Sequence, residues 1–195
     1  KTLDNDINIV AASPKIIHGG LKNTIWWCGW YWSWGFLKFH KLMNLKKKRI
    51  IDSPSYKGIK DTDVVSGCCS IYRADALKLA GLGDEKFFFG PEDFDLSFRL
   101  KKYGRLVVNL DIKTFHLLTQ SSKISGWLSR SYYEAKGFLI LIKKKGNLLD
   151  KIIGYSYFIL RIPYYLILLI FKKREKDRVF GYCLGCYDFF LNIKQ

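Results

Sequence analysis

The chain has 195 residues, which is enough for one domain or for a small domain with an appendage. Its 49% hydrophobic and 16% aromatic content excludes intrinsic disorder as the default state. The net charge of +16 calls for an anionic partner, and nucleic acid, anionic lipid headgroups and sugar-nucleotide phosphates all qualify. The chain starts at Lys1 with no signal segment after it, so we expect a fragment or a processed form that lacks its true N-terminus.

The first third of the chain combines one strand pattern with an aromatic run and a basic segment. Residues 7–12 predict a short buried strand that ends at the turn-like pair Ser13–Pro14. Residues 25–36 hold five tryptophans and are too rich in Trp and Gly for a helix, so they predict a hairpin or a loop that lines a cleft. Residues 38–60 are basic and rich in turn formers, and they predict a mobile surface segment.

Strand and helix patterns alternate through the middle of the chain. The expected strands are residues 64–73, 106–110 and 113–116. The expected helices, residues 73–80 and 92–103, end at Gly81 and Gly104. This alternation predicts an α/β domain with a mixed sheet over residues 1–122.

From residue 123 to residue 195 the sequence is typical of helix throughout, with 14 basic and 5 acidic residues. We therefore expect a second part, a helical and amphipathic tail close to a membrane.

Residues 152–171 contain a single charge, Arg161, and Pro163 near the middle. Their length just reaches a membrane span, but an arginine at mid-depth costs about 2.5–3.5 kcal/mol. Tyrosines and basic flanks favour a helix lying in an anionic leaflet, while a span and simple packing on the catalytic domain remain alternatives.

Five cysteines, an odd number, argue against a closed disulfide framework and for reduced thiols in a cytosol. Cys183 and Cys186 have the spacing of half a zinc site. A second pair with suitable spacing is missing from the sequence, so we interpret them as small packing residues of a helix.

The most informative local feature is an acidic helix start. Glu92 and Asp93 follow Gly90–Pro91 and occupy the first helical turn, where the helix dipole favours negative charge. Asp95 and Arg99 are four positions apart and can pair on one helix face. These features suffice to explain the segment structurally. Three carboxylates within four positions on the rim of a cleft would also suit a general base.

The motifs around this helix resemble family 2 glycosyltransferases, and rhamnosyltransferase-like members most closely. In chain order they are VSGCCSIYR (65–73), LAG (79–81), DEKFF (84–88), EDFDL (92–96), Arg99, Gly104 and His116. A looser match, DINIVAASPKI (6–16), precedes them. The resemblance implies the C-terminal, acceptor-side half of a GT-A mixed sheet. It also implies an inverting enzyme that moves a sugar from a nucleotide-diphosphate sugar to a glycan or lipid-linked acceptor.

The resemblance also assigns roles to individual residues. It makes Asp93 the general base that deprotonates the acceptor hydroxyl, and Glu92 the residue that orients the acceptor or supports Asp93. It makes His116 the last ligand of a Mg²⁺ or Mn²⁺ site. It places Gly67 where the backbone lies close to substrate, and Cys68 at a neighbouring position where small residues are usual.

Trp30 and Trp32 are candidates for acceptor binding, because sugar rings stack on aromatic faces. The alternatives are a core-filling aromatic strand and contact with a membrane interface.

One family element is missing. The DxD motif that holds the metal and the diphosphate follows an apolar strand, whereas Asp61-Thr62-Asp63 precedes one. We therefore expect the nucleotide-binding half to lie upstream and this chain to be an incomplete catalyst.

The relatives act in polysaccharide and cell-envelope biosynthesis. This implies a cytoplasmic protein, peripheral on the inner face of the plasma membrane.

Two other interpretations stay open. One is a basic nucleic-acid-binding module, although we expect no nucleic acid because no recognised binding motif is present. The other is an inactive membrane-docking scaffold of glycosyltransferase ancestry.

Overall fold

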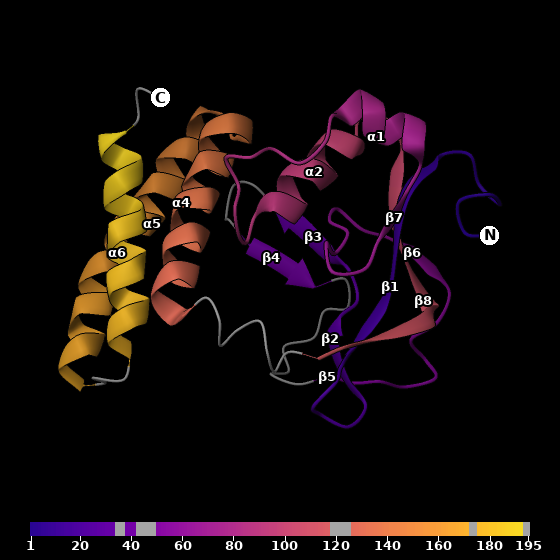
Figure 1. The fold of residues 1–195 in the computed structure, drawn as a ribbon, viewed down its shortest axis with the longest axis horizontal. Coiled ribbons are helices and arrows are strands. Elements are labelled where there is room, and N and C mark those ends of the chain that lie inside the picture. Colours follow the sequence, from indigo (N-terminus) through magenta and orange to yellow (C-terminus); the bar gives the residue numbers. More distant parts are fainter. Residues whose placement is uncertain (34–37, 42–49, 118–125, 172–174, 193–195) are drawn as a thin grey trace. The chain divides into compact units, whose positions relative to one another are not determined.

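The computed structural model describes residues 1–33, 38–41, 50–117, 126–171 and 175–192 (Figure 1). Within them the chain forms a mixed sheet and five helices, so the predicted mixed α/β class is confirmed. The chain divides into two compact units. We call residues 1–33, 38–84 and 93–119 the sheet unit, and residues 34–37, 85–92 and 120–195 the helical unit.

Two long parallel strands, β1 (Ile9–His18) and β8 (Arg105–His116), form the centre of the sheet. The strand order is β5-β2-β1-β8-β6, with β7 also paired to β1, and every pairing except β1–β8 is antiparallel. The shorter strands are β2 (Thr24–Trp27), β5 (Ile50–Ile51), β6 (Ile59–Asp61) and β7 (Ile71–Tyr72). Strands β3 (Trp30–Ser33) and β4 (Lys38–Lys41) form a separate hairpin.

Strand β1 is buried along most of its length, and β8 is buried in its first half. Such strands are expected to be nearly continuous apolar runs, as in Ile9–Ala12 and Leu106–Val108. Lys15 is the exception, since it is fully buried within β1 and forms an ion pair of 2.7 Å with Asp52. The sheet thus encloses one internal charge pair as well as its apolar core.

Strand β1 continues through Ser13–Pro14, where the sequence predicted a turn. The β1–β8 register shifts between Pro14 and Lys15, and on the β8 side the pairing jumps from Asn109 to Lys113. Proline lacks a ladder N–H and is tolerated at such an irregularity. The same bulge explains why the two strands predicted at 106–110 and 113–116 are one strand, β8.

Two further predictions for the sheet unit were wrong. Residues 64–73 form a turn with only Ile71–Tyr72 in a strand, because the turn is held by the side chains described below. The segment 38–60, predicted as a mobile surface segment, contains β4, β5 and part of β6. Strand β4 forms a hairpin with β3, whereas β5 and β6 pair with β2 and β8, partners that the sequence pattern does not show. Residues 42–49 lie outside the described residues.

Helices α1 (Ala74–Ala80) and α2 (Glu92–Leu100) closely match the prediction. Helix α1 ends at Gly81, whose φ of +78° favours glycine. Helix α2 ends at Leu100, and a turn then leads to Gly104. At Gly104 a Cβ would lie 2.4 Å from the carbonyl oxygen of Asn8, so this position requires glycine for a close backbone approach.

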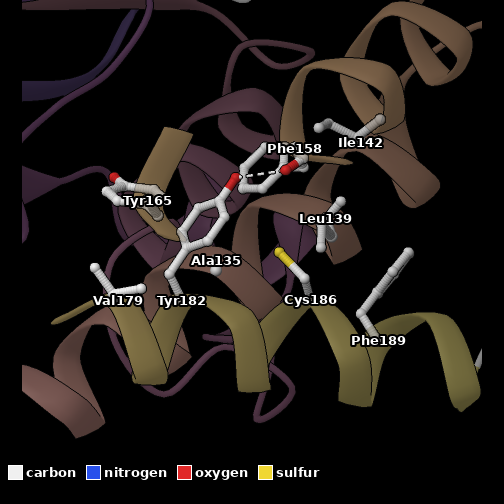
Figure 2. Close-up of a cluster of buried hydrophobic side chains, with 9 residues drawn as sticks. All are labelled: Ala135, Leu139, Ile142, Phe158, Tyr165, Val179, Tyr182, Cys186 and Phe189. Carbon is white, nitrogen blue, oxygen red and sulfur yellow. Dashed lines mark hydrogen bonds between the residues drawn. The ribbon is translucent and has the colours of Figure 1, made fainter. Parts of the chain in front are cut away.

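The helical unit consists of α4 (Gly126–Lys145), α5 (Leu148–Phe171) and α6 (Lys176–Leu191). Figure 2 shows their shared core, in which the Tyr182 hydroxyl donates to the carbonyl oxygen of Phe158 at 3.0 Å. Among the described residues, none of the helices combines the length and hydrophobicity that crossing a membrane requires.

Helix α6 approaches α4 closely at two glycines. A Cβ at Gly181 would lie 2.1 Å from the carbonyl oxygen of Leu128, and one at Gly185 would lie 2.5 Å from that of Tyr132. The spacing of these glycines, four residues apart, puts both on the side of α6 that faces α4. All five cysteines are free thiols, and Cys186 is buried in the helical core. The packing role predicted for Cys186 is thereby confirmed.

Candidate active site around Asp93

Helix α2, which carries Asp93, is fixed by buried polar contacts on its inner side. Asp95 is fully buried and accepts a hydrogen bond of 2.8 Å from Nε of Arg99. The Arg99 guanidinium also donates to the carbonyl oxygens of Ala80 and Gly81 at the end of α1. The predicted pairing of Asp95 with Arg99 is confirmed, and it joins the two helices.

The turn over residues 66–70 is held against both β1 and α2. The Ser66 N–H donates to Oγ of Ser13 at 3.1 Å, and the Ser13 and Ser70 hydroxyls share a hydrogen bond. The Ser70 hydroxyl also donates to the carbonyl oxygen of Ser66 at 2.6 Å. On the α2 side, the Val65 N–H donates to the buried hydroxyl of Ser97 at 3.1 Å. These bonds fix the turn by side-chain contacts in place of a strand ladder.

Asp93 meets this turn at Gly67. The Gly67 N–H donates to Oδ2 of Asp93 at 2.8 Å. A Cβ at Gly67 would lie 2.1 Å from Oδ1 of Asp93 and 2.9 Å from Cγ. Any side chain at this position would displace the carboxylate, so glycine is what allows this close contact. In the structure the Gly67 backbone lies against the Asp93 carboxylate, and its approach to substrate stays a prediction.

Two weak acids lie within the electrostatic reach of Asp93. Burial, with a smaller contribution from the Asp93 charge, raises the pKa of the Cys68 thiol. Burial also raises the pKa of Tyr72, where the Asp93 charge again adds to the shift. Cys68 and Tyr72 thus stay protonated at neutral pH, as neutral polar groups beside a carboxylate that is only half-buried.

Glu92, the other predicted catalytic carboxylate, is the first residue of α2 and belongs to the helical unit. It is half-buried, and its Oε2 atom has no hydrogen-bond partner within the described residues. The segment before it is held on α4 by aromatic contacts. Phe88 lies 4.7 Å from the Tyr133 ring, and Arg130 lies 5.2 Å from the Phe89 ring.

The rings of Trp30 and Trp32 pack against helix α2. Trp30 lies 5.6 Å from the Phe94 ring, and Trp32 lies 5.7 Å from both the Phe94 and Phe98 rings, in edge-on arrangements. Both tryptophans are half-buried. These contacts fit the packing interpretation of the aromatic run, and acceptor binding by the remaining ring surface stays a prediction.

The hairpin that carries these tryptophans is tied to residues 61–63. The Trp30 N–H donates to Oγ1 of Thr62 at 2.9 Å, and the Trp32 N–H donates to Oδ2 of Asp63 at 2.8 Å. Asp63 also pairs with Lys101, and Asp61 pairs with Arg105 at 2.8 Å. Both carboxylates therefore have structural partners within the sheet unit.

His116, the predicted metal ligand, ends β8 directly beside His18 of β1. Its ring lies 4.7 Å from the ring of Trp26 in an edge-on contact, and the Nδ1 atom of His18 accepts the Gly20 N–H at 3.0 Å. Within the residues that the structure describes, no group of three or more His, Cys, Asp or Glu side chains could hold a metal ion. The donor set present here therefore does not fit a complete divalent-cation site, and His116 as a ligand stays a prediction.

Tyr72 and the serines that hold the turn were not predicted from the sequence. Tyr72 belongs to the VSGCCSIYR motif, so its position in a family-like motif was visible in the sequence. Its proximity to Asp93 arises only through the packing of the folded chain. No protein-family model matches the chain, and no curated protein is significantly similar to it.

Proposed function

We propose that the sheet unit is the acceptor-side part of an inverting glycosyltransferase of the GT-A, family 2 type. The observation that carries this proposal is the contact of Asp93 with Gly67. Two motifs that resemble this family, separated by about 25 residues in the chain, meet in space at one half-exposed carboxylate. A Cβ at position 67 would push this carboxylate aside.

The proposed role of Asp93 is that of general base. A sugar hydroxyl is a poor nucleophile, so a carboxylate within hydrogen-bond reach must take its proton as the oxygen attacks the anomeric carbon. The Gly67 N–H orients the carboxylate through Oδ2, and the bonds of α2 and of the 66–70 turn hold both partners. One displacement from the face opposite the leaving nucleoside diphosphate inverts the anomeric centre.

Other predicted residues would surround the acceptor. Glu92 would orient a hydroxyl of the acceptor sugar, and the protonated thiol of Cys68 would lie beside the base. Trp30 and Trp32 would offer ring surface to a sugar as well as packing on α2. The proposed substrates are a nucleotide-diphosphate sugar and a glycan or lipid-linked acceptor, in polysaccharide biosynthesis of the cell envelope.

A Mg²⁺ or Mn²⁺ ion would neutralise the leaving diphosphate. His116 would be one ligand, but the described residues do not supply the others, so we derive no step through the ion. The protein would work in the cytoplasm, peripheral on the inner face of the plasma membrane.

The test is the substitution Asp93→Asn in the natural full-length protein. Its transfer rate is measured with a panel of nucleoside-diphosphate sugars and glycan or lipid-phosphate acceptors. The rate should fall by about 10²–10⁴-fold, because the amide cannot accept the proton, while binding of the donor should be unchanged. Asp75→Asn is the matched control, since Asp75 is an exposed acid in the first turn of α1.

Normal turnover in Asp93→Asn would remove Asp93 from the base role. Absence of transfer by the wild-type protein with the whole panel would favour the inactive docking scaffold instead. Strong, salt-dependent binding of single-stranded oligonucleotides would favour the nucleic-acid module.

A further inference from the structure

Helix α5 carries apolar side chains on two opposite faces. One face packs in the core of the helical unit through Tyr155, Phe158, Ile162, Tyr165 and Leu169 (Figure 2 shows two of these). On a surface helix the opposite face would be polar. Here it exposes Ile152, Ile159, Leu160, Tyr164, Leu166 and Ile167.

Arg161, the single charge within residues 152–171, does not interrupt this exposed apolar face. Its guanidinium donates to the hydroxyls of Tyr157 at 2.9 Å and Tyr165 at 2.7 Å. It also lies 5.1–5.6 Å from the rings of Tyr157, Tyr165 and Tyr182. Hydrogen bonds and cation–π contacts therefore satisfy the arginine inside the protein, which removes the main objection to placing this helix against lipid.

Helix α6 adds a second apolar stripe. Phe180, Leu184, Tyr187 and Leu191 follow one another at helical spacing and are exposed by 62%, 40%, 63% and 64%. Between this stripe and α5 lies an apolar groove of about 490 Å³, lined by Ile159 and Ile162 of α5 and by residues of α6. The two stripes and the groove form one continuous apolar surface, which we call the α5–α6 face. Soluble monomers rarely expose so large a patch without a partner.

The charge around the α5–α6 face indicates what kind of partner it has. The segment 123–195 carries 14 basic and 5 acidic residues. Of the acids, Asp150 is buried, and Asp188 and Glu175 form ion pairs with Lys136 and Arg178.

Further lysines line a cavity of about 580 Å³ on the α4 side of α6, away from the groove. Its charged lining residues are Lys86, Lys136, Lys143 and Lys144, with Glu85 and Asp188. A second copy of the chain would bring a net charge of +16 against an equal one. An anionic lipid surface offers opposite charge together with an apolar interior.

We propose that the α5–α6 face docks on an anionic lipid bilayer, with both helices lying in the interface and basic residues near their N-terminal ends, Lys151 of α5 and Lys176 of α6, contacting headgroup phosphates. This inference rests on the peripheral location proposed above, but it requires no sugar transfer. The predicted amphipathic character of the tail is not confirmed for α5, which is apolar toward the core and toward the outside. Apolar side chains would enter the acyl boundary, and Arg161 would stay paired with its tyrosines.

The test is co-sedimentation of the full chain with large vesicles of phosphatidylcholine, with or without 30% phosphatidylglycerol. We compare the wild type with a variant that combines Leu160→Ser, Ile167→Ser, Phe180→Ser and Tyr187→Ser. Each substitution should lower the partition coefficient about 5-fold and the four together more than 100-fold, because each removes apolar area from the acyl boundary. These side chains are exposed, so the fold should keep its thermal midpoint.

The matched control is Leu79→Ser with Leu82→Ser, which removes equally exposed leucines from the sheet unit and should leave binding unchanged. A second variant, Lys151→Gln with Lys176→Gln, should weaken binding to anionic vesicles about 10-fold or more and leave binding to neutral vesicles unchanged.

Equal binding of the fourfold variant and the wild type would overturn the proposal. So would equal binding of the wild type to neutral and anionic vesicles, or no binding to either. A wild-type dimer that the fourfold variant dissociates, with vesicle binding unaffected, would identify a second copy as the occupant and would overturn it too. Asp93→Asn should bind vesicles normally, so failure here is distinguishable from failure of the catalytic proposal.

Discussion

Replacing Gly67 with alanine tests the central contact of the candidate site without any knowledge of the substrate. The new Cβ would lie 2.1 Å from Oδ1 and 2.9 Å from Cγ of Asp93. To reach an ordinary van der Waals separation, the carboxylate must move by more than about 1 Å. The hydrogen bond of 2.8 Å from the Gly67 N–H to Oδ2 is then lost.

The size of the change in unfolding free energy caused by Gly67→Ala follows from two opposing effects. A hydrogen bond to a charged group contributes about 1.5–3 kcal/mol, and the contact at Gly67 is exposed enough to place it at the lower end. Alanine also lowers the conformational entropy of the unfolded chain, which stabilises the folded protein by about 0.4–1 kcal/mol. We expect Gly67→Ala to lower the free energy of unfolding by about 1 kcal/mol. If Asp93 is the base, transfer should fall by about 100-fold, since a shift of about 1 Å misplaces the reacting group.

The assay is urea unfolding followed by tryptophan fluorescence, applied to Gly67→Ala, Asp93→Ala and the double variant. Without the Asp93 carboxylate, alanine at position 67 meets no obstacle, so most of its destabilisation should vanish. Gly83→Ala is the control, because no atom lies within 4 Å of its new Cβ, and it should change stability by less than about 0.5 kcal/mol. If Gly67→Ala destabilises both backgrounds equally, the inferred contact is not what requires glycine.

Two further predictions concern stability. Burial alone would raise the pKa of Asp52, but hydrogen bonds and charge from Lys113 and Lys15 hold it below its usual value. The stabilisation that the ionised Asp52 carboxylate gives the folded state is therefore fully present above its unfolded pKa of about 3.9. It is lost as the pH falls through the lower pKa that Asp52 has in the folded state. Asp52→Asn should thus lower the unfolding free energy by about 3 kcal/mol at pH 7 and by less at pH 3, in urea titrations. An equal loss at both pH values would contradict the ion-pair argument. Gly181→Ala should destabilise the helical unit by about 2–3 kcal/mol in thermal unfolding followed by circular dichroism, because the Leu128 carbonyl must move; a change below about 0.5 kcal/mol would show that α4 and α6 adjust freely.

The sequence predicted those elements whose signals are local. Gly81 marks the end of α1, and Gly90–Pro91 with Glu92 marks the start of α2. The helical character after residue 122 was also predicted correctly. Such signals act within one helical turn, so neighbouring residues are sufficient to set them.

The errors share one cause, which is pairing between distant segments. Ser13–Pro14 is typical of a turn, yet it lies in the middle of β1, because the long partner β8 continues the ladder past a bulge. The apolar start of the 64–73 segment is typical of a strand, yet Ser13, Ser97 and Asp93 hold most of it as a turn. Contacts between residues so far apart leave no periodic signal in the chain.

For the candidate site, the sequence by itself determined which residues are candidates for chemistry, namely a helix start with Glu92 and Asp93 and a separate motif with Gly67 and Cys68. Only the tertiary structure decided that Asp93 and Gly67 meet, and that the carboxylate occupies the space that a Cβ at position 67 would take. In the tail, the sequence determined a long apolar helix. Packing against α4 and α6 decided which of its apolar faces is buried and which stays exposed, because burial depends on neighbours that the pattern of one helix does not specify.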